Sequence, residues 1–177
     1  RDVERSRGLG DVYKRQLFNY LELPLPAEIG AKFEECKELE QKVLPDVKGV
    51  PYIYGNTQYD CFELNSYLCS LGLVPQLIQS NKLSEANFAD IESILAQTDP
   101  YICKAANIAP LQYVYDVLHP WFYMGHEFGD RLRRKGIALL HSDPAGKMLG
   151  FECSSFMLQA VAKAVADAKK FREEAGL

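Results

Sequence analysis

The stretch from Tyr101 to Ser142 decides the fold: YICKAANIAPLQYVYDVLHPWFYMGHEFGDRLRRKGIALLHS. Three short apolar runs alternate there with two amphipathic segments of helical length, and small or polar residues follow each apolar run. This alternation is typical of a βαβαβ unit with a parallel sheet. In an open parallel sheet, ligands bind outside the carboxyl ends of the strands, where these polar residues would gather. We therefore expect any functional site at that edge.

The alternation of predicted strands and helices continues on both sides of this stretch. The predicted strands are residues 50–54, 73–78, 101–105, 121–124 and 137–140. The predicted helices are residues 27–44, 59–71, 84–97, 108–118, 128–135 and 149–174. Because parallel strands need right-handed crossovers, the helices should fall on both faces of the sheet. The sequence therefore predicts an α/β fold: a three-layer, Rossmann-like domain with a mainly parallel sheet of about five strands.

The composition fits one globular domain. The chain has 177 residues, of which 47% are hydrophobic and 25% charged, which argues against disorder. A formal net charge of -4 offers no basic field for nucleic acid. No apolar run approaches the ~18 residues of a membrane span, and the sequence shows no secretory signal. We expect a soluble, cytoplasmic protein that binds neither membrane nor nucleic acid.

Cysteine usage supports a reducing compartment. The odd number of cysteines, with no CxxC pair, does not favour a disulfide framework. The default expectation for each thiol is that of a small buried hydrophobe. The five cysteines are Cys36, Cys61, Cys69, Cys103 and Cys153.

The chain divides into three parts. Residues 1–16, RDVERSRGLGDVYKRQ, lack apolar periodicity and resemble the translated sequencing-adapter tails found on some metagenomic reading frames. They are predicted to be a non-native tail, with a genuine basic arm as the alternative. Residues 17–49 read as a connector followed by a helix, because Pro24 and Pro26 exclude a regular helix before that point. Residues 50–177 form the predicted Rossmann-like domain.

Several catalytic motifs are missing from the sequence. The first predicted strand is followed by GNTQYD instead of GxGxxG. The sequence therefore lacks the glycines that let the backbone of a dinucleotide-binding loop approach a pyrophosphate closely. The sequence also has no P-loop, no HExxH and no GxSxG. A self-contained NAD enzyme, ATPase, zinc protease or serine hydrolase is therefore not expected.

Histidines follow two of the predicted strands. His141, with Ser142, ends the last strand, and a neutral imidazole there could bind a metal or donate a proton near pH 7. The alternative is a hydrogen bond from His141 to a neighbouring loop carbonyl. His126 and Glu127 end the preceding strand. They could form an acid–base pair, or they could cap the helix that follows.

Short polar residues follow two other strands. Gly55, Asn56 and Thr57 end the first predicted strand, and Asn107 lies just past the third. These residues could contact a cofactor, although such residues often serve only as turn or cap residues. His119 lies at the opposite edge of the sheet, so a structural role is expected for it.

Four segments, taken in order, resemble the C-terminal Rossmann-like domain of nitrogenase component 1 proteins. The resemblance covers about residues 27–170 and rests on the order and spacing of the segments. The segments are PYIYG (51–55), LGLVPQLIQ (71–79), HPWFYMGHEFGDRLRRKGIALLHS (119–142) and GFECSSFMLQAVAKAV (150–165).

The resemblance implies specific roles for the strand-end residues. In the α-subunit of the molybdenum enzyme, the histidine of the matching His-Ser pair binds the iron–molybdenum cofactor, and the residue here is His141. The resemblance thus implies His141 as a metal ligand. Together with the gathering of polar groups at one sheet edge, it leads us to expect His141 and His126 as catalytic residues. On the same grounds we expect cofactor contacts from the strand-end residues Gly55, Asn56, Thr57, Asn107, His141 and Ser142.

The sequence departs from the family at three places. The loop of residues 55–58 has no arginine, and residues 143–146 read DPAG instead of an aromatic and glycine-rich run. None of the five cysteines matches the cluster ligands of the family. These differences favour a nitrogenase-like reductase of unknown substrate over molybdenum nitrogenase itself.

The resemblance implies a C-terminal fragment of a nitrogenase-like component 1 oxidoreductase subunit. Its cofactor would be an iron–sulfur or related metallocluster, ligated mainly by residues outside this chain. Its partners would be a second component 1 type subunit and an ATP-dependent iron–sulfur reductase protein. Two alternatives stay open: a non-catalytic scaffold or cofactor-assembly subunit, and a small-molecule binding domain that uses the same sheet edge.

Overall fold

The computed structural model describes residues 20, 24, 26–55, 61–80, 83–104, 113–125, 129–141 and 151–177, without the side chain of Cys61. Residues 1–16 and most of residues 17–25 lie outside this part, so the predicted tail and connector stay predictions. The strands are β1 (Pro51–Tyr54), β2 (Val74–Ser80), β3 (Tyr101–Lys104), β4 (Phe122–Met124) and β5 (Ala138–Leu140). The helices are α3 (Ala27–Val47), α4 (Cys61–Ser70), the 3-10 helix η1 (Glu85–Asn87), α5 (Phe88–Leu95), α6 (Tyr115–Leu118), α7 (Gly129–Arg134) and α8 (Phe151–Ala175).

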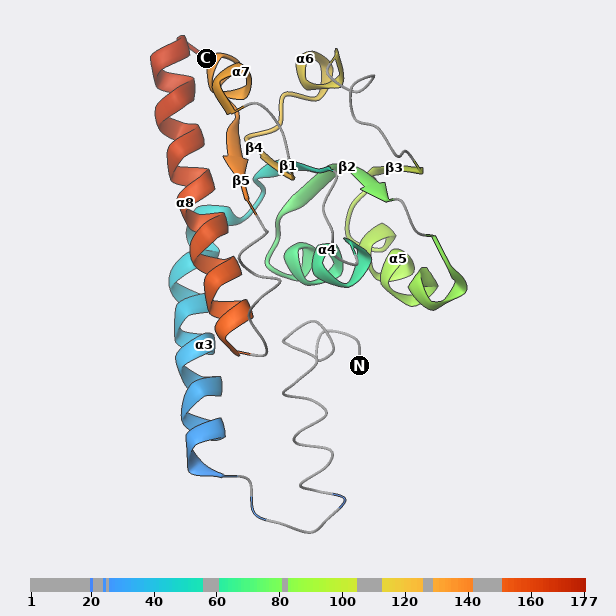
Figure 1. The fold of residues 1–177 in the computed structure, drawn as a ribbon, viewed down its shortest axis with the longest axis vertical. Helices are drawn as coiled ribbons and strands as arrows, with labels where there is room; N and C mark the ends of the chain where they lie inside the picture. Colours follow the sequence, from blue (N-terminus) through green and yellow to red (C-terminus); the bar gives the residue numbers. More distant parts are fainter. Residues whose placement is uncertain are drawn as a thin grey trace.

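The strands form one sheet with the order β3-β2-β1-β4-β5, in which every pair is parallel (Figure 1). The predicted α/β class and the parallel sheet of five strands are therefore confirmed. The register shifts between Tyr52 and Ile53, which pair with Pro75 and Leu77 and leave Gln76 as an extra residue in β2. Proline cannot donate a ladder hydrogen bond, which explains an irregularity beside Pro75 inside a central strand.

Side chains alternate between the two faces of the sheet, as the strand period of two requires. One core lies on the face that we call the α3/α8 face, where α3, α4, α5 and α8 pack. The other core lies on the α6/α7 face, where α6 and α7 pack. Phe122 and Met124 point to the α3/α8 face, whereas Tyr123 between them points to the α6/α7 face. The result is the predicted three-layer arrangement.

The largest layer is built by the two long helices. Buried residues of α8 recur at helical spacing against the sheet: Met157, Leu158, Val161, Ala164, Val165 and Ala168. Helix α3 lies beside α8 in parallel orientation (Figure 1). Near its middle, the Cys36 Sγ lies 3.3 Å from the Ser155 Oγ, and near its end Asp46 lies 3.8 Å from Lys169. No helix within the described ranges is long and apolar enough to cross a membrane.

Helix boundaries differ from the prediction at several points. Helix α3 was expected to stop before Pro45 but continues to Val47. Pro45 lies in the last turn, so the backbone hydrogen bond that it cannot donate is lost only at the end of the helix. The N–H of Lys48 still donates to the carbonyl of Leu44. The segment predicted as one helix over 84–97 is the 3-10 helix η1 followed by α5.

Candidate functional site

The candidate site begins at the carboxyl ends of β1 and β4, which lie side by side at the centre of the sheet. Helix α4 follows β1 and packs on the α3/α8 face, whereas α7 follows β4 and packs on the α6/α7 face. The chain thus leaves these neighbouring strands in opposite directions, which is the definition of a topological switch point. Open α/β sheets bind ligands in the crevice that such a point creates.

Gly55 and Gly125 end these two strands. The N–H of Gly55 donates to the Met124 carbonyl over 2.8 Å, and the N–H of Gly125 donates to the Leu140 carbonyl over 3.2 Å. Both backbone donors therefore serve to extend the pairing of the strands beyond their last regular residues. Gly125 has φ +147°, a backbone conformation that residues other than glycine rarely adopt.

The phenol of Tyr123 lies against both glycines. A Cβ atom built on Gly55 would lie 1.8 Å from the Tyr123 Oη, and one built on Gly125 would lie 3.0 Å from the same atom. The tyrosine is fully buried, and its ring meets that of Tyr115 edge to face at 5.7 Å and 76°. The structure thus gives a packing reason for glycine at position 55, in addition to the predicted role as a strand-end contact.

His141 lies at the same edge of the sheet, directly after β5, and its side chain is exposed. Strand β4 separates β5 from β1, so two strand spacings, roughly 10 Å, lie between the ends that carry His141 and Gly55. The imidazole borders a groove of about 440 Å³ between β5 and α8. The lining residues are Leu139, Leu140, His141, Phe156, Gln159, Ala160, Lys163, Ala164 and Asp167.

The groove has an apolar floor and a polar rim. Leu140 and Ala164 are buried, and Phe156 packs against the same core. On the rim, Lys163 donates to Asp167 over 2.5 Å, one helical turn further along α8. The exposed imidazole of His141 is thus accompanied by an amide, an ammonium and a carboxylate. Such a rim can orient a polar ligand whose body lies on the apolar floor.

The remaining predicted site residues lie outside the described residues. Five of them stay predictions: Asn56, Thr57, Asn107, His126 and Ser142. His119 is described, and it is exposed at the amino end of β4 with φ 50°, where it ends α6. Its position at the edge opposite His141 agrees with the expected structural role.

Burial disfavours metal binding by three of the four described thiols. Burial raises the pKa of the Cys69 thiol to about 11, although a hydrogen bond with Thr98 partly opposes this effect. Burial also raises the pKa of Cys103 and of Cys153. The thiolate is the form that binds metals, so these environments disfavour ligation. Within the described ranges no three His, Cys, Asp or Glu residues are grouped to hold a metal ion. At the carboxyl edge of the sheet the described residues include one exposed imidazole, that of His141, and no grouped metal site.

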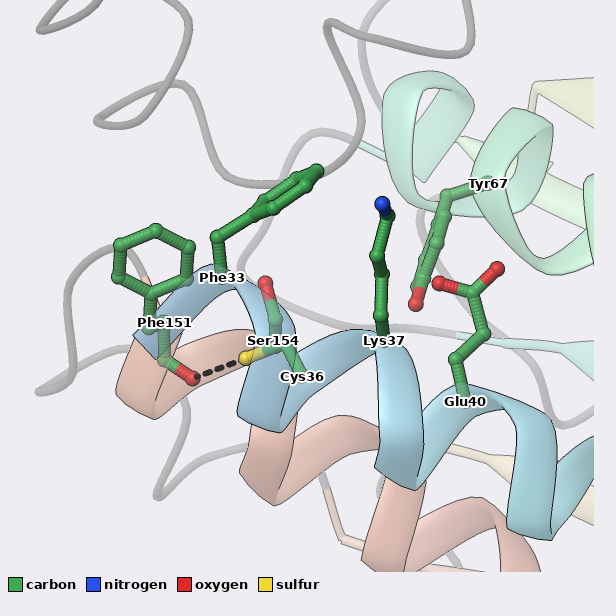
Figure 2. A pocket seen from close by; sticks show the side chains of 7 residues that line it. All are labelled: Phe33, Cys36, Lys37, Glu40, Tyr67, Phe151 and Ser154. Atoms are coloured by element: carbon green, nitrogen blue, oxygen red, sulfur yellow. Dashed lines mark hydrogen bonds between the residues drawn. The ribbon is translucent and has the colours of Figure 1, made fainter. Parts of the chain in front are cut away.

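A second, smaller cavity lies where α3, α4 and the start of α8 meet (Figure 2). Its volume is about 20 Å³, which suffices for roughly one water molecule. The Cys36 thiol donates to the Phe151 carbonyl over 3.8 Å, and the Lys37 ammonium lies 4.7 Å from the centre of the Phe33 ring. Figure 2 shows these side chains with Glu40, Tyr67 and Ser154 around the gap. The sequence analysis did not find this cavity, because its residues come from three distant segments.

The fold and its switch point define a Rossmann-like α/β domain with an all-parallel sheet. A chain of the solved structure described as "Nitrogenase Cp1 at pH 6.5" is similar to it with a TM-score of 0.69 and 12% sequence identity. The match covers 89% of the present chain and 37% of that chain, so the present chain spans little more than a third of that protein's length. This likeness confirms the expected nitrogenase-like fold. No family model matches the sequence. No curated protein matches it either.

Proposed function

We propose that this chain is the C-terminal Rossmann-like domain of a nitrogenase-like component 1 oxidoreductase subunit. The observation that carries the proposal is the shared fold over 89% of the chain. The position of His141 supports it, because the resemblance implies a cofactor ligand at this residue and the imidazole is exposed beside a groove at the ligand-binding edge of the sheet. In this proposal the reduced substrate is a small molecule of unknown identity.

The domain's own contribution is to present polar groups to a cofactor held mainly by other parts of the protein. An iron–sulfur or related metallocluster, when bound, supplies the electrons for the reduction. The His141 imidazole either binds that cluster or donates a proton at the groove, and the proposal also gives His126 and the strand-end amides a role in the site. The leucine and phenylalanine floor of the groove excludes water from one side of the ligand.

The proposal includes two protein partners and a compartment. Electrons come from an ATP-dependent iron–sulfur reductase, and the subunit pairs with a second component 1 type subunit. Cys36, Cys69, Cys103 and Cys153 are free thiols, which supports function in a reducing cytoplasm.

Anaerobic purification of the longer parent protein tests this function. We expect bound iron, iron–sulfur absorption, and substrate reduction that depends on the reductase partner and ATP. The variant His141→Ala should lose most of the activity or change the spectrum of the bound cluster. His119→Asn is the matched control, since asparagine tolerates the left-handed backbone at that exposed position. A colourless protein that stays free of iron after cluster reconstitution would refute the proposal.

A scaffold or cofactor-assembly subunit is the second candidate function. The likeness to the solved structure, at 12% sequence identity, concerns the fold and fits this candidate as well. In that case His141→Ala would leave the cluster content and the reductase activity of the assembled protein unchanged. The same pair of variants therefore decides between the two candidates.

A further inference from the structure

The crevice between β1 and β4 is the place where a Rossmann-like sheet normally accepts a phosphate-bearing ligand. Two features prepare such a site: glycine backbone that a pyrophosphate can approach closely, and N–H groups free to donate to its oxygens. Glycine is present here at both strand ends, Gly55 and Gly125. The geometry at these glycines, however, serves a different purpose.

The space beside Gly55 is filled from within the protein. A Cβ atom at this residue would meet the Tyr123 ring at 1.8 Å from Oη, 2.1 Å from Cζ and 2.4 Å from Cε2. The ring therefore lies directly on the α-carbon of Gly55, on the α6/α7 face. The two glycines hold the phenol between them, because a Cβ at Gly125 would also lie 3.0 Å from the ring. The space that each missing side chain leaves is thus occupied by tyrosine.

The two backbone donors described at these strand ends, the N–H groups of Gly55 and Gly125, are also engaged. The N–H of Gly55 donates to β4 and the N–H of Gly125 donates to β5, as described above. An incoming phosphate would have to break a strand-pairing hydrogen bond to gain either donor. It would also have to displace a ring that is 0% exposed and that packs edge to face on Tyr115.

We propose that Tyr123 closes the β1–β4 crevice to nucleotides and other phosphate ligands at the two strand ends, Gly55 and Gly125. Tyr123 is thus a specificity-determining residue of the domain. It excludes the ligand class that the fold most often binds at this point. The inference rests on Gly55, Tyr123 and Gly125 and does not depend on the proposed oxidoreductase activity.

Amide NMR of the ¹⁵N-labelled 177-residue chain tests the closure directly. We expect the Gly55 and Gly125 resonances to stay in place when ADP or inorganic phosphate is added at millimolar concentration. Tyr123→Phe should behave in the same way, because the ring that fills the crevice is retained. Saturable shifts of either glycine resonance in the wild-type chain would overturn the proposal.

A second experiment tests whether the phenol fills a discrete space. Tyr123→Ala should leave a cavity that p-cresol can occupy, so p-cresol at ten times its Kd should raise the Tm of this variant by about 3–6 °C. The wild-type chain and Tyr113→Ala, which removes a tyrosine that is 81% exposed, should show no such rise. An equal rise in all three proteins, or none in a folded Tyr123→Ala, would contradict the proposal. If Tyr123→Ala does not fold, the wild-type and Tyr123→Phe titrations still decide the question.

Discussion

Gly55→Ala adds a single methyl group at the point where β1 meets the Tyr123 ring. Alanine is compatible with the backbone there, because Gly55 is not among the residues with positive φ. The cost is therefore steric: the new Cβ would lie 1.8 Å from the Tyr123 Oη, far closer than real Cβ contacts. The ring has little room to move, since it is fully buried between Gly125 and Tyr115. Overpacking of this kind costs about 1–3 kcal/mol.

Urea and thermal unfolding of the 177-residue chain measure this cost. A loss of this size should lower the Tm by roughly 2–12 °C for a chain of this length. In a double-mutant cycle with Tyr123→Ala, the cost of Gly55→Ala should nearly vanish, because the clashing ring is gone. Gly30→Ala in α3 is the control, since a Cβ there meets nothing within 4 Å and alanine favours a helix by up to about 1 kcal/mol. The reasoning fails if Gly55→Ala is as stable as wild type, or if its cost persists without the tyrosine.

Three further outcomes are expected. Tyr52→Phe removes the hydroxyl that donates to the buried Asn65 Oδ1 over 2.5 Å. The free energy of unfolding in urea should therefore fall by about 1–3 kcal/mol. An unchanged value would contradict the importance of this hydrogen bond. Burial raises the pKa of Cys69 to about 11 from an ordinary 9.0, so the thiol ionises first in the unfolded chain. The free energy of unfolding should therefore decline as pH rises from 9 to 11. Urea titrations at each pH should show a shallower decline for Cys69→Ala than for the wild-type chain. Equal slopes for the two proteins would exclude a contribution from this thiol. His141→Ala should change the free energy of unfolding by less than about 0.5 kcal/mol, because the side chain is exposed. A larger decrease in the free energy of unfolding would indicate a structural role for His141.

The central strands β1 and β4 could be predicted because they are buried on both faces. A run such as VPYIY at 50–54 is apolar throughout, and its end is marked by Gly55. That signal is local, so it can be recognised without knowledge of the tertiary contacts. Helix ends were less predictable. Pro45 is tolerated in the last turn of α3 because only its own N–H donor is missing and the helix continues for just two residues, to Val47.

The arrangement of the candidate site could be predicted only in part. Placement of His141 and Gly55 at one edge follows from parallel strands, but their separation depends on strand order, which puts β4 between them. The contact between Gly55 and Tyr123 joins residues far apart in the sequence. No local pattern distinguishes a glycine that accommodates a neighbouring ring from one that turns the chain. The groove beside β5 likewise requires α8, whose contribution appears only once the helix is packed.

The long terminal helix has a consequence for how the chain is made. Helix α8 supplies six buried residues to the α3/α8 face, and it is synthesised after every other element that the structure describes. Until it leaves the ribosome, the sheet keeps a wide apolar surface that has no cover, and α3 lacks its neighbour. At ~5–20 residues per second, the earlier strands wait for a second or more in that state. During this interval the exposed apolar surface makes the nascent chain prone to aggregation, which is the situation in which chaperones bind.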